Sequence, residues 1–167
     1  MIRAIVHADK KWGIGKNNDM MFSLPKDMKF FRETTSGNVV VMGGNTLRSF
    51  PGWKPLKNRV NIVISRGQVR DDCIIVRTVD ELKTEMKKRE NEEIFVIGGG
   101  AIYRELLPYC HEALVTKVDA DGGAEVFFPN LDMLPNFQLV YESEPMDDNG
   151  YTIRFTTYKN NAVQPLW

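Results

Sequence analysis

The sequence predicts a single-domain α/β protein with a mostly parallel central sheet of about eight strands, an antiparallel C-terminal edge strand and helices on both faces. Short runs rich in Val and Ile recur along the chain with helical stretches between them, a pattern typical of strands joined by right-handed crossovers. Several runs lack polar alternation, which indicates strands covered on both faces. After residue 118 this pattern stops, and two extended segments around a polar turn predict an antiparallel hairpin at the sheet edge.

The elements are expected in the following order. The parallel strands are predicted at Ile2–Ala8, Val39–Met42, Val60–Ser65, Cys73–Val76, Ile94–Ile97 and Ala113–Val118. Helices are predicted over Pro25–Thr35, Asn45–Phe50, Val79–Arg89 and Ala101–Leu107. Pro25 suits a first helical turn, where its missing N–H is no loss. The hairpin strands are expected at Phe137–Ser143 and Tyr151–Tyr158, around the turn Pro145–Gly150. The domain is expected to span residues 1–159, with a loose tail over 160–167 in which Leu166 and Trp167 are able to dock.

Composition excludes several classes of protein. The 167 residues include 22 basic and 22 acidic side chains, so no net field draws the chain to nucleic acid or to a membrane. Cys73 and Cys110 form no CxxC pair and suit packing in a reducing compartment. His7 and His111 have no metal-ligand spacing, so no metal site is expected. The N-terminal apolar run is too short for a signal peptide, and no stretch approaches the ~20 apolar residues of a membrane span. We therefore expect a soluble, cytoplasmic protein, with a monomer as the default.

Asp27 is the most informative single residue. At helical spacing it shares a face with Leu24 and Phe31, whereas Lys26 and Lys29 fall on the other side. A carboxylate buried among apolar groups is costly unless a partner satisfies it, and a cationic or amidine-like ligand is such a partner. Alternatively, with Leu24 as N-cap, Asp27 is the third helical residue, where a carboxylate relieves unpaired N–H groups. The segment alone leaves both interpretations open.

Two strands run straight into glycine and then into a helix, over Val39–Thr46 and Ile94–Tyr103. Glycine there lets the backbone lie close to a ligand, and the helix that follows offers free N–H groups to an anion. Each turn alone is weak evidence for a phosphate site, because ordinary α/β turns have the same pattern and neither turn matches GxGxxG. Together the turns favour a pyrophosphate, and hence a dinucleotide. Arg66 and Arg77 end two strands and suit a ribose phosphate, although from the residues alone solvated arginines are the better interpretation.

Taken in order, these segments resemble dihydrofolate reductase over almost the whole chain, from Ile2 to Tyr158. The order and spacing of the matching segments carry the resemblance: Trp12–Gly15, Leu24–Met28, Val41–Gly43, Lys54–Leu56 followed by Arg59, Val96–Tyr103, Thr116 before Asp119, and Phe127–Pro129. The resemblance implies reduction of 7,8-dihydrofolate to tetrahydrofolate. Hydride would pass from C4 of NADPH to C6 of the pterin, while water delivers a proton to N5.

The resemblance also implies a role for each matching residue. Asp27 would bind the pterin 2-amino group and N3, Thr116 would orient that carboxylate, and Met20 would lie near the centre of a lid over Trp12–Leu24. The implied substrate-binding residues are Ile5, Asp27, Met28, Phe31, Phe50, Leu56, Arg59, Ile97 and Tyr103, with Arg59 holding the α-carboxylate of the glutamate tail. Dihydrofolate and antifolate inhibitors are the implied small-molecule partners.

The implied NADPH-binding residues lie in the lid, at the glycine turns and at neighbouring strand ends. They are His7, Ile14, Gly15, Asn18, Met20, Gly43, Gly44, Asn45, Thr46, Ser65, Arg66, Arg77, Ile97, Gly98, Gly99, Gly100, Ala101, Ile102 and Tyr103. The resemblance further implies a cis peptide between Gly98 and Gly99.

Four positions depart from the family pattern. Gly44 stands where a basic residue usually contacts the 2′-phosphate, so NADPH is expected to be preferred less strongly than usual. Met21-Phe22 replaces the common Pro-Trp in the lid, and Ala124-Glu125 replaces a Gly-Asp pair that supports it. His7 replaces a small residue at the junction of both pockets, where it either alters antifolate affinity or points into a gap.

Two rival functions remain. One is another NADPH reductase of the same architecture, such as the riboflavin-pathway reductase, which has no need of a pterin-binding carboxylate. The other is a catalytically silent nucleotide- or RNA-binding module, which the balanced charge and the lack of a basic or aromatic patch disfavour. Loss of NADPH absorbance with dihydrofolate, repeated with Asp27→Asn, separates the three.

Overall fold

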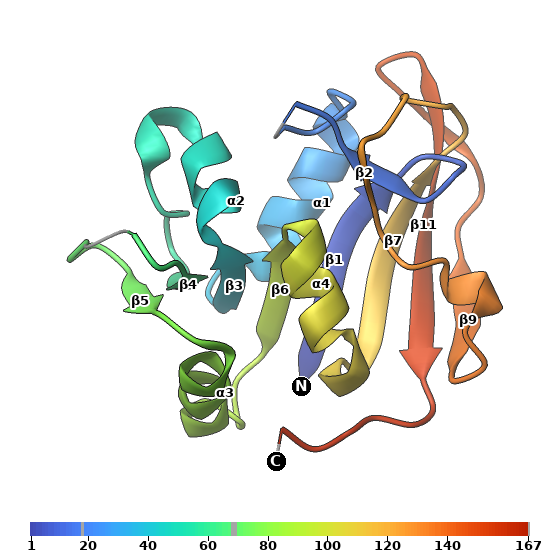
Figure 1. Cartoon of the computed structure of the whole chain (residues 1–167). Coiled ribbons are helices and arrows are strands. Elements are labelled where there is room, and N and C mark those ends of the chain that lie inside the picture. The colour runs from blue at the N-terminus through green and yellow to red at the C-terminus, as the bar shows by residue number, and fades with distance from the viewer. Residues whose placement is uncertain (18, 68–69, 167) are drawn as a thin grey trace.

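The computed structural model describes residues 1–17, 19–67 and 70–166, and the strands of these residues form a nine-stranded main sheet (Figure 1). Across the sheet the order is β10-β11-β7-β1-β6-β3-β4-β5, and β9 pairs with β11. The strands are β1 (Ile2–Ala8), β3 (Val39–Gly43), β4 (Val60–Ile64), β5 (Ile74–Val76), β6 (Ile94–Gly98), β7 (Glu112–Val118), β9 (Phe137–Glu142), β10 (Met146–Asp148) and β11 (Tyr151–Asn160).

The direction of the strands confirms the predicted fold class. From β7 to β5 every neighbouring pair is parallel, whereas β11 runs antiparallel to β7, and β9 and β10 run antiparallel to β11. In the pairing of β1 with β7, His7 lies opposite Thr116. Both residues therefore present their side chains on the same face of the sheet, because side chains directly opposite each other share a face.

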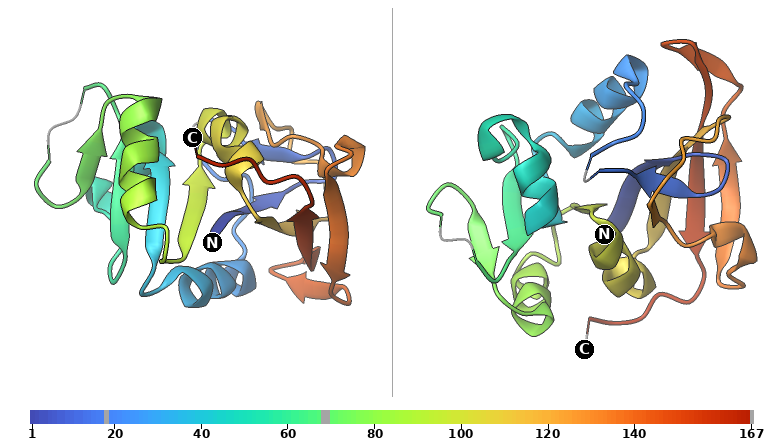
Figure 2. Two further views of the ribbon diagram at one scale, coloured as in Figure 1. Left: turned by 90° about the horizontal axis from the view of Figure 1, so that it is seen from below. Right: turned by 45° about the horizontal axis from the view of Figure 1, so that its top comes forward.

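Helices cover both faces of the sheet. They are α1 (Pro25–Thr35), α2 (Gly44–Ser49), α3 (Val79–Lys88) and α4 (Gly100–Leu106), with short 3-10 turns at Pro51–Trp53, Leu107–Tyr109 and Leu131–Met133. Seen from below, α1 lies on one side of the sheet and α3 and α4 on the other (Figure 2). The core divides accordingly, since Val39 and Val41 belong to the apolar cluster of α3 and α4, and Val40 and Met42 to the cluster of α1 and α2.

The C-terminal hairpin is more elaborate than predicted. The segment expected to be a turn, Pro145–Gly150, contains β10, and Asn149 and Gly150 make the tight turn into β11 with φ of 54° and 86°. Asn-Gly is the dipeptide that favours such a two-residue hairpin turn. Of the expected loose tail, Leu166 packs on the core and the Gln164 N–H donates to the Pro108 carbonyl at 3.0 Å. Trp167 lies outside the described residues.

A second, two-stranded sheet was not predicted. It pairs β2 (Gly13–Gly15) with β8 (Val126–Phe127) and joins the expected lid to the segment before Phe128. Both strands are too short to give a periodic sequence signal. The pairing nevertheless decides where the lid begins, because it ties Gly13 and Gly15 to the rest of the domain.

Candidate active site

The carboxylate of Asp27 is buried in the first turn of α1. The residue is 8% exposed, and its helix starts after Leu24 with Pro25 in the first turn, as the sequence predicts. Because α1 lies across the sheet face formed by β1 and β7, its inward side meets the side chains of those strands. Asp27 is thus a charged group enclosed by protein, which is rare unless the group is paired or has a function.

Two side chains from the sheet hold this carboxylate. The Thr116 hydroxyl donates to Oδ1 at 2.7 Å, and Nδ1 of His7 lies 3.2 Å from Oδ2. The two partners are the residues that lie opposite each other in β1 and β7. The Thr116 bond agrees with the resemblance. The contact of His7 with Asp27 has no sequence signal, because only the packing of α1 on β1 brings the two residues together.

The helix-capping interpretation of Asp27 is wrong, because another carboxylate accepts the free N–H groups at the start of α1. Asp148 of β10 accepts the backbone N–H of Lys26 at 3.0 Å and that of Asp27 at 3.1 Å. It is only 2% exposed, so the first turn of α1 is closed from inside the protein. Sequence reasoning missed Asp148, since it lies in the segment read as a polar turn. The Asp27 carboxylate is therefore left for the interior of the site.

Tyr103 of α4 lies on the other side of β1 and is fully enclosed. Its hydroxyl donates to the Ile5 carbonyl at 2.7 Å. Burial, and then the negative charge of Asp27, raise the pKa of Tyr103 far above its ordinary value. Tyr103 therefore stays protonated and acts as a hydrogen-bond donor. The Ile5 carbonyl, which the resemblance assigns to the substrate, already accepts this bond with one of its two lone pairs.

The predicted apolar wall of the substrate site assembles on the α1 face of the sheet. Phe31, Phe50, Leu56 and Ile97 are partly buried and pack against one cluster that includes Ile5. Met28, one residue after Asp27, is half-buried. The structure thus brings these residues together as predicted, although plain core packing would do the same.

Arg59 lies near the C-terminal end of α1. Its Nε donates to the Thr35 hydroxyl at 2.9 Å, another nitrogen donates to the Lys57 carbonyl at 2.9 Å, and the guanidinium lies 5.8 Å from the Phe31 ring centroid. Burial, and then the neighbouring Arg32, lower the pKa of Arg59. Among the described residues Arg59 forms no ion pair. A carboxylate ligand would supply the missing partner.

The two glycine turns lie side by side, because β3 and β6 are neighbours in the sheet. The Gly98–Gly99 peptide is cis, which confirms the expectation from the resemblance. A Cβ atom at Gly43 would lie 3.2 Å from the Ile102 side chain, and one at Gly98 would lie 3.3 Å from the Thr46 hydroxyl. A side chain at either glycine would therefore be in tight contact with the neighbouring turn or helix. Helices α2 and α4 begin one residue earlier than predicted, at Gly44 and Gly100, and Asn45 and Ala101 are exposed.

Two arginines gather at the ends of β3, β4 and β5, around Ser65. Arg77 donates to the Ser65 carbonyl at 2.8 Å, and a Cβ atom at Gly44 would lie 3.0 Å from the Ser65 hydroxyl. The same Cβ would lie 3.3 Å from Nη1 of Arg48. The other terminal nitrogen of this guanidinium, Nη2, donates to the Asn45 side-chain oxygen. Arg48 thus fills the space beside Gly44. Sequence reasoning missed it, although a residue four positions after a helical glycine lies above it on the same face. Arg66 is exposed.

The predicted lid is anchored at its start and near its middle. Asp9 is buried, and its carboxylate accepts the N–H groups of Lys11, Gly13 and Gly122 at 2.7–3.0 Å. The Glu125 carboxylate accepts the Asn17 N–H at 2.8 Å, so this residue supports the lid in this chain.

The predicted lid residues themselves differ in burial. Ile14 and Gly15 are half-buried in β2, whereas Met20 is 52% exposed and lies outside the buried group around Asp27. Asn18 lies outside the described residues. Phe22 is buried, with its ring centroid 4.8 Å from that of Tyr151 and 6.1 Å from that of His7.

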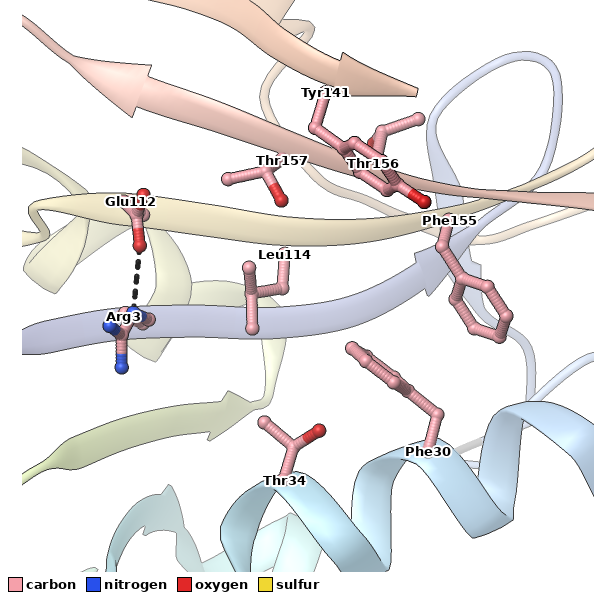
Figure 3. A pocket seen from close by; sticks show the side chains of 9 residues that line it. All are labelled: Arg3, Phe30, Thr34, Glu112, Leu114, Tyr141, Phe155, Thr156 and Thr157. Carbon is pink, nitrogen blue, oxygen red and sulfur yellow. Dashed lines mark hydrogen bonds and ion pairs between the residues drawn. The ribbon is translucent and has the colours of Figure 1, made fainter. Parts of the chain in front are cut away.

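Two hollows elsewhere in the surface are lined by residues other than Asp27, Arg59 and the glycine turns. One of about 320 Å³ opens on the α1 side of the sheet, where Phe30 of α1 faces Phe155 of β11 and Leu114 lies to one side (Figure 3). Another, of about 440 Å³, lies beside Pro108 and Pro129. In the part of the chain that the structure describes, no cluster of three or more His, Cys, Asp or Glu side chains is arranged to hold a metal ion. None of the helices described has the length and apolar composition needed to cross a membrane.

Comparison with known proteins gives one consistent result. A family model described as dihydrofolate reductase matches residues 1–160. The chain is 32% identical to the dihydrofolate reductase of Bacillus subtilis over 163 residues, covering 95% of this chain and 94% of that protein. It is 34% identical to the dihydrofolate reductase of Haemophilus influenzae over 144 residues, covering 85% and 88%. It is also 33% identical to the bifunctional dihydrofolate reductase-thymidylate synthase 2 of Arabidopsis thaliana, of whose length it spans 31%.

Proposed function

The chain belongs to the dihydrofolate reductase family, and from that premise we propose that it reduces 7,8-dihydrofolate to 5,6,7,8-tetrahydrofolate with NADPH as cofactor. One observation carries the proposal: the buried carboxylate of Asp27, held by Thr116 and His7. An ionised carboxylate has about four acceptor positions, and these two partners occupy two of them. The remaining positions suit the paired N–H groups of a pterin.

The rest of the substrate fits the residues that continue from Asp27 along α1. The apolar side chains of Phe31, Phe50 and Leu56 offer walls to the flat rings, and Arg59 has no anionic partner among the described residues. A glutamate carboxylate on Arg59 would form a charge-assisted pair, the stronger kind of hydrogen bond. The substrate would thus lie with its heterocycle at the start of α1 and its acidic tail at the end.

The cofactor proposal rests on the two adjoining glycine turns and on the charge next to them. The turns follow neighbouring parallel strands and each leads into a helix, an arrangement that suits a backbone-bound pyrophosphate. Arg77, Ser65 and Arg48 gather beside Gly44, and this donor set fits an additional phosphate. When bound, NADPH supplies the hydride that is added to C6 of the pterin.

The chain itself supplies orientation and charge. Asp27, in surroundings that exclude water, polarises the bound heterocycle more strongly than an exposed carboxylate would. No acidic side chain is assigned to protonate N5, and water delivers that proton. The lid, anchored by Asp9 and Glu125, shields the reacting atoms from further water.

The test is a turnover assay that follows loss of NADPH absorbance with dihydrofolate. Asp27→Asn keeps the shape of the side chain and removes its charge, so kcat at neutral pH is expected to fall by about 10²-fold or more. Asp147→Asn is the matched control, because Asp147 is an exposed carboxylate next to the cap residue Asp148. Robust turnover by Asp27→Asn would refute the assignment. Binding of NADPH without any turnover by the unmodified chain would indicate a silent nucleotide-binding module.

A further inference from the structure

His7 is a buried histidine with one nitrogen engaged and one without a partner. The residue is 8% exposed, and its Nδ1 lies 3.2 Å from Oδ2 of Asp27. Its Nε2 is enclosed and has no hydrogen-bond partner among the described residues. Buried polar atoms are nearly always hydrogen-bonded, so an exception of this kind requires an explanation.

The chemistry of the pair fixes where the hydrogen lies. An ionised carboxylate only accepts hydrogen bonds, so Nδ1 of His7 must carry the hydrogen that it shares with Asp27. When Nδ1 carries the only ring hydrogen, Nε2 has a free lone pair and is an acceptor. The Phe22 ring next to His7 cannot donate to it. A bound ligand with an N–H group would.

Resting on the proposed function, we propose that His7 is a positioning residue of the substrate site. Its Nδ1–H holds Oδ2 of Asp27 while the Thr116 hydroxyl holds Oδ1, and its Nε2 accepts a hydrogen bond from an N–H group of bound pterin or nicotinamide. Because His7 and Thr116 lie opposite each other on neighbouring strands, the two donors fix the carboxylate plane relative to the sheet. The carboxylate then presents its remaining lone pairs to the ligand in one orientation.

Three substitutions separate positioning from packing. His7→Asn retains an N–H near the place of Nδ1, His7→Gln places its amide near Nε2, and His7→Leu retains apolar volume without any donor. If His7 only filled space, His7→Leu would be the most active. If it positions Asp27, kcat/KM for dihydrofolate falls by about 10-fold or more in His7→Leu and His7→Gln, and His7→Asn recovers much of the loss.

Urea unfolding measures stability alongside activity. His7→Leu removes a buried, unpaired nitrogen but leaves Oδ2 of Asp27 without its donor, so its free energy of unfolding is expected to fall below that of His7→Asn. His7→Asn and His7→Gln both keep an amide, so a difference in activity between these two variants at equal stability cannot be explained by damaged packing. Equal activity of His7→Leu and His7→Asn, with Asp27→Asn still inactive, would overturn the role of His7 and leave the proposed function intact.

Nitrogen NMR of the His7 imidazole tests the hydrogen positions directly. We expect a ring hydrogen on Nδ1, and an Nε2 resonance that shifts when folate or NADP⁺ is added. Adding each probe alone identifies which of the two donates to Nε2. A ring with its hydrogen on Nε2, or an Nε2 resonance unchanged by both probes together, would contradict the proposal.

Discussion

Asp148 accepts the backbone N–H of Asp27 through its Oδ2 at 3.1 Å, although the two residues are 121 positions apart in the chain. Two carboxylates therefore have separate roles here, one in capping the helix and one in the site. Asp148, on β10, closes the first turn of α1, and Asp27 turns its own side chain toward Thr116 and His7. The site therefore depends on the C-terminal hairpin, which reaches α1 only in the folded domain.

Removing the cap should cost stability without abolishing the site. Asp148→Ala leaves two N–H groups of α1 without a partner, so the free energy of unfolding is expected to fall by about 2 kcal/mol. Asp148→Asn retains one carbonyl acceptor and should lose about half as much. Urea unfolding measures both, and the assay with dihydrofolate should still detect turnover in each. Unchanged stability of Asp148→Ala would show that these bonds are not needed to hold α1.

Arg59→Leu tests where the acidic end of the substrate lies. Loss of one charge-assisted pair is expected to raise KM for dihydrofolate by about 10- to 100-fold. The control is 7,8-dihydropterin, a substrate without the glutamate tail, whose KM should not change between the two proteins. Because Arg59 also bonds Thr35 and Lys57, the unfolding free energy is measured alongside. An equal loss with both substrates would place the tail elsewhere.

Arg48 should contribute to the choice of cofactor. If Arg48 supplies the charge that Gly44 lacks, Arg48→Leu raises KM for NADPH by about 10-fold and leaves KM for NADH unchanged. Arg70→Leu removes the same charge from the segment between β4 and β5, where Arg70 pairs with Asp72 at 2.7 Å, and it is the matched control. The unmodified chain should prefer NADPH. An NADH efficiency equal to or above that of NADPH would refute the 2′-phosphate site altogether.

Local signals made much of the fold predictable. β1 and α1 have the predicted limits, because Ile2–Ala8 is rich in apolar residues and Pro25 marks the start of a helix. The starts of α2 and α4 were displaced by one residue, since Gly44 and Gly100 look like turn residues and are helical only in their close-packed setting. β10 escaped prediction, as its two aspartates suggest a loop when nothing indicates that one of them caps a helix.

The site was predictable only where a family pattern exists. The bond between Thr116 and Asp27 followed from the resemblance, and the structure has it. The contacts of His7 with Asp27 and of Arg48 with the space at Gly44 have no counterpart in that pattern. They arise from the packing of α1 on β1 and from a gap left by glycine. The first cannot be read from spacing in a single sequence, whereas the spacing of four residues between Gly44 and Arg48 is a signal for the second.

Alkaline pH should destabilise the domain through Cys110. This thiol is fully buried and donates to the Leu106 carbonyl, and burial raises its pKa from 9.0 to about 12. The native thiol therefore keeps its proton through the range in which the unfolded thiol loses it. Below about pH 8 both states are protonated and pH has no effect through this group. From about pH 9 to 12 the unfolded state binds fewer protons, so the free energy of unfolding falls as pH rises.

The expected slope is up to ~1.4 kcal/mol per pH unit for one such group. Urea unfolding between about pH 8 and 9 isolates it, because Tyr103 and Tyr158, whose pKa values burial also raises, begin to contribute only above about pH 9. Cys110→Ala should flatten the slope in that range. Cys73→Ala is the control: Cys73 is only half-buried, burial and then Asp72 raise its pKa, and its removal should change the slope less. If the slope survives in Cys110→Ala, the buried thiol is not the group that loses its proton on unfolding.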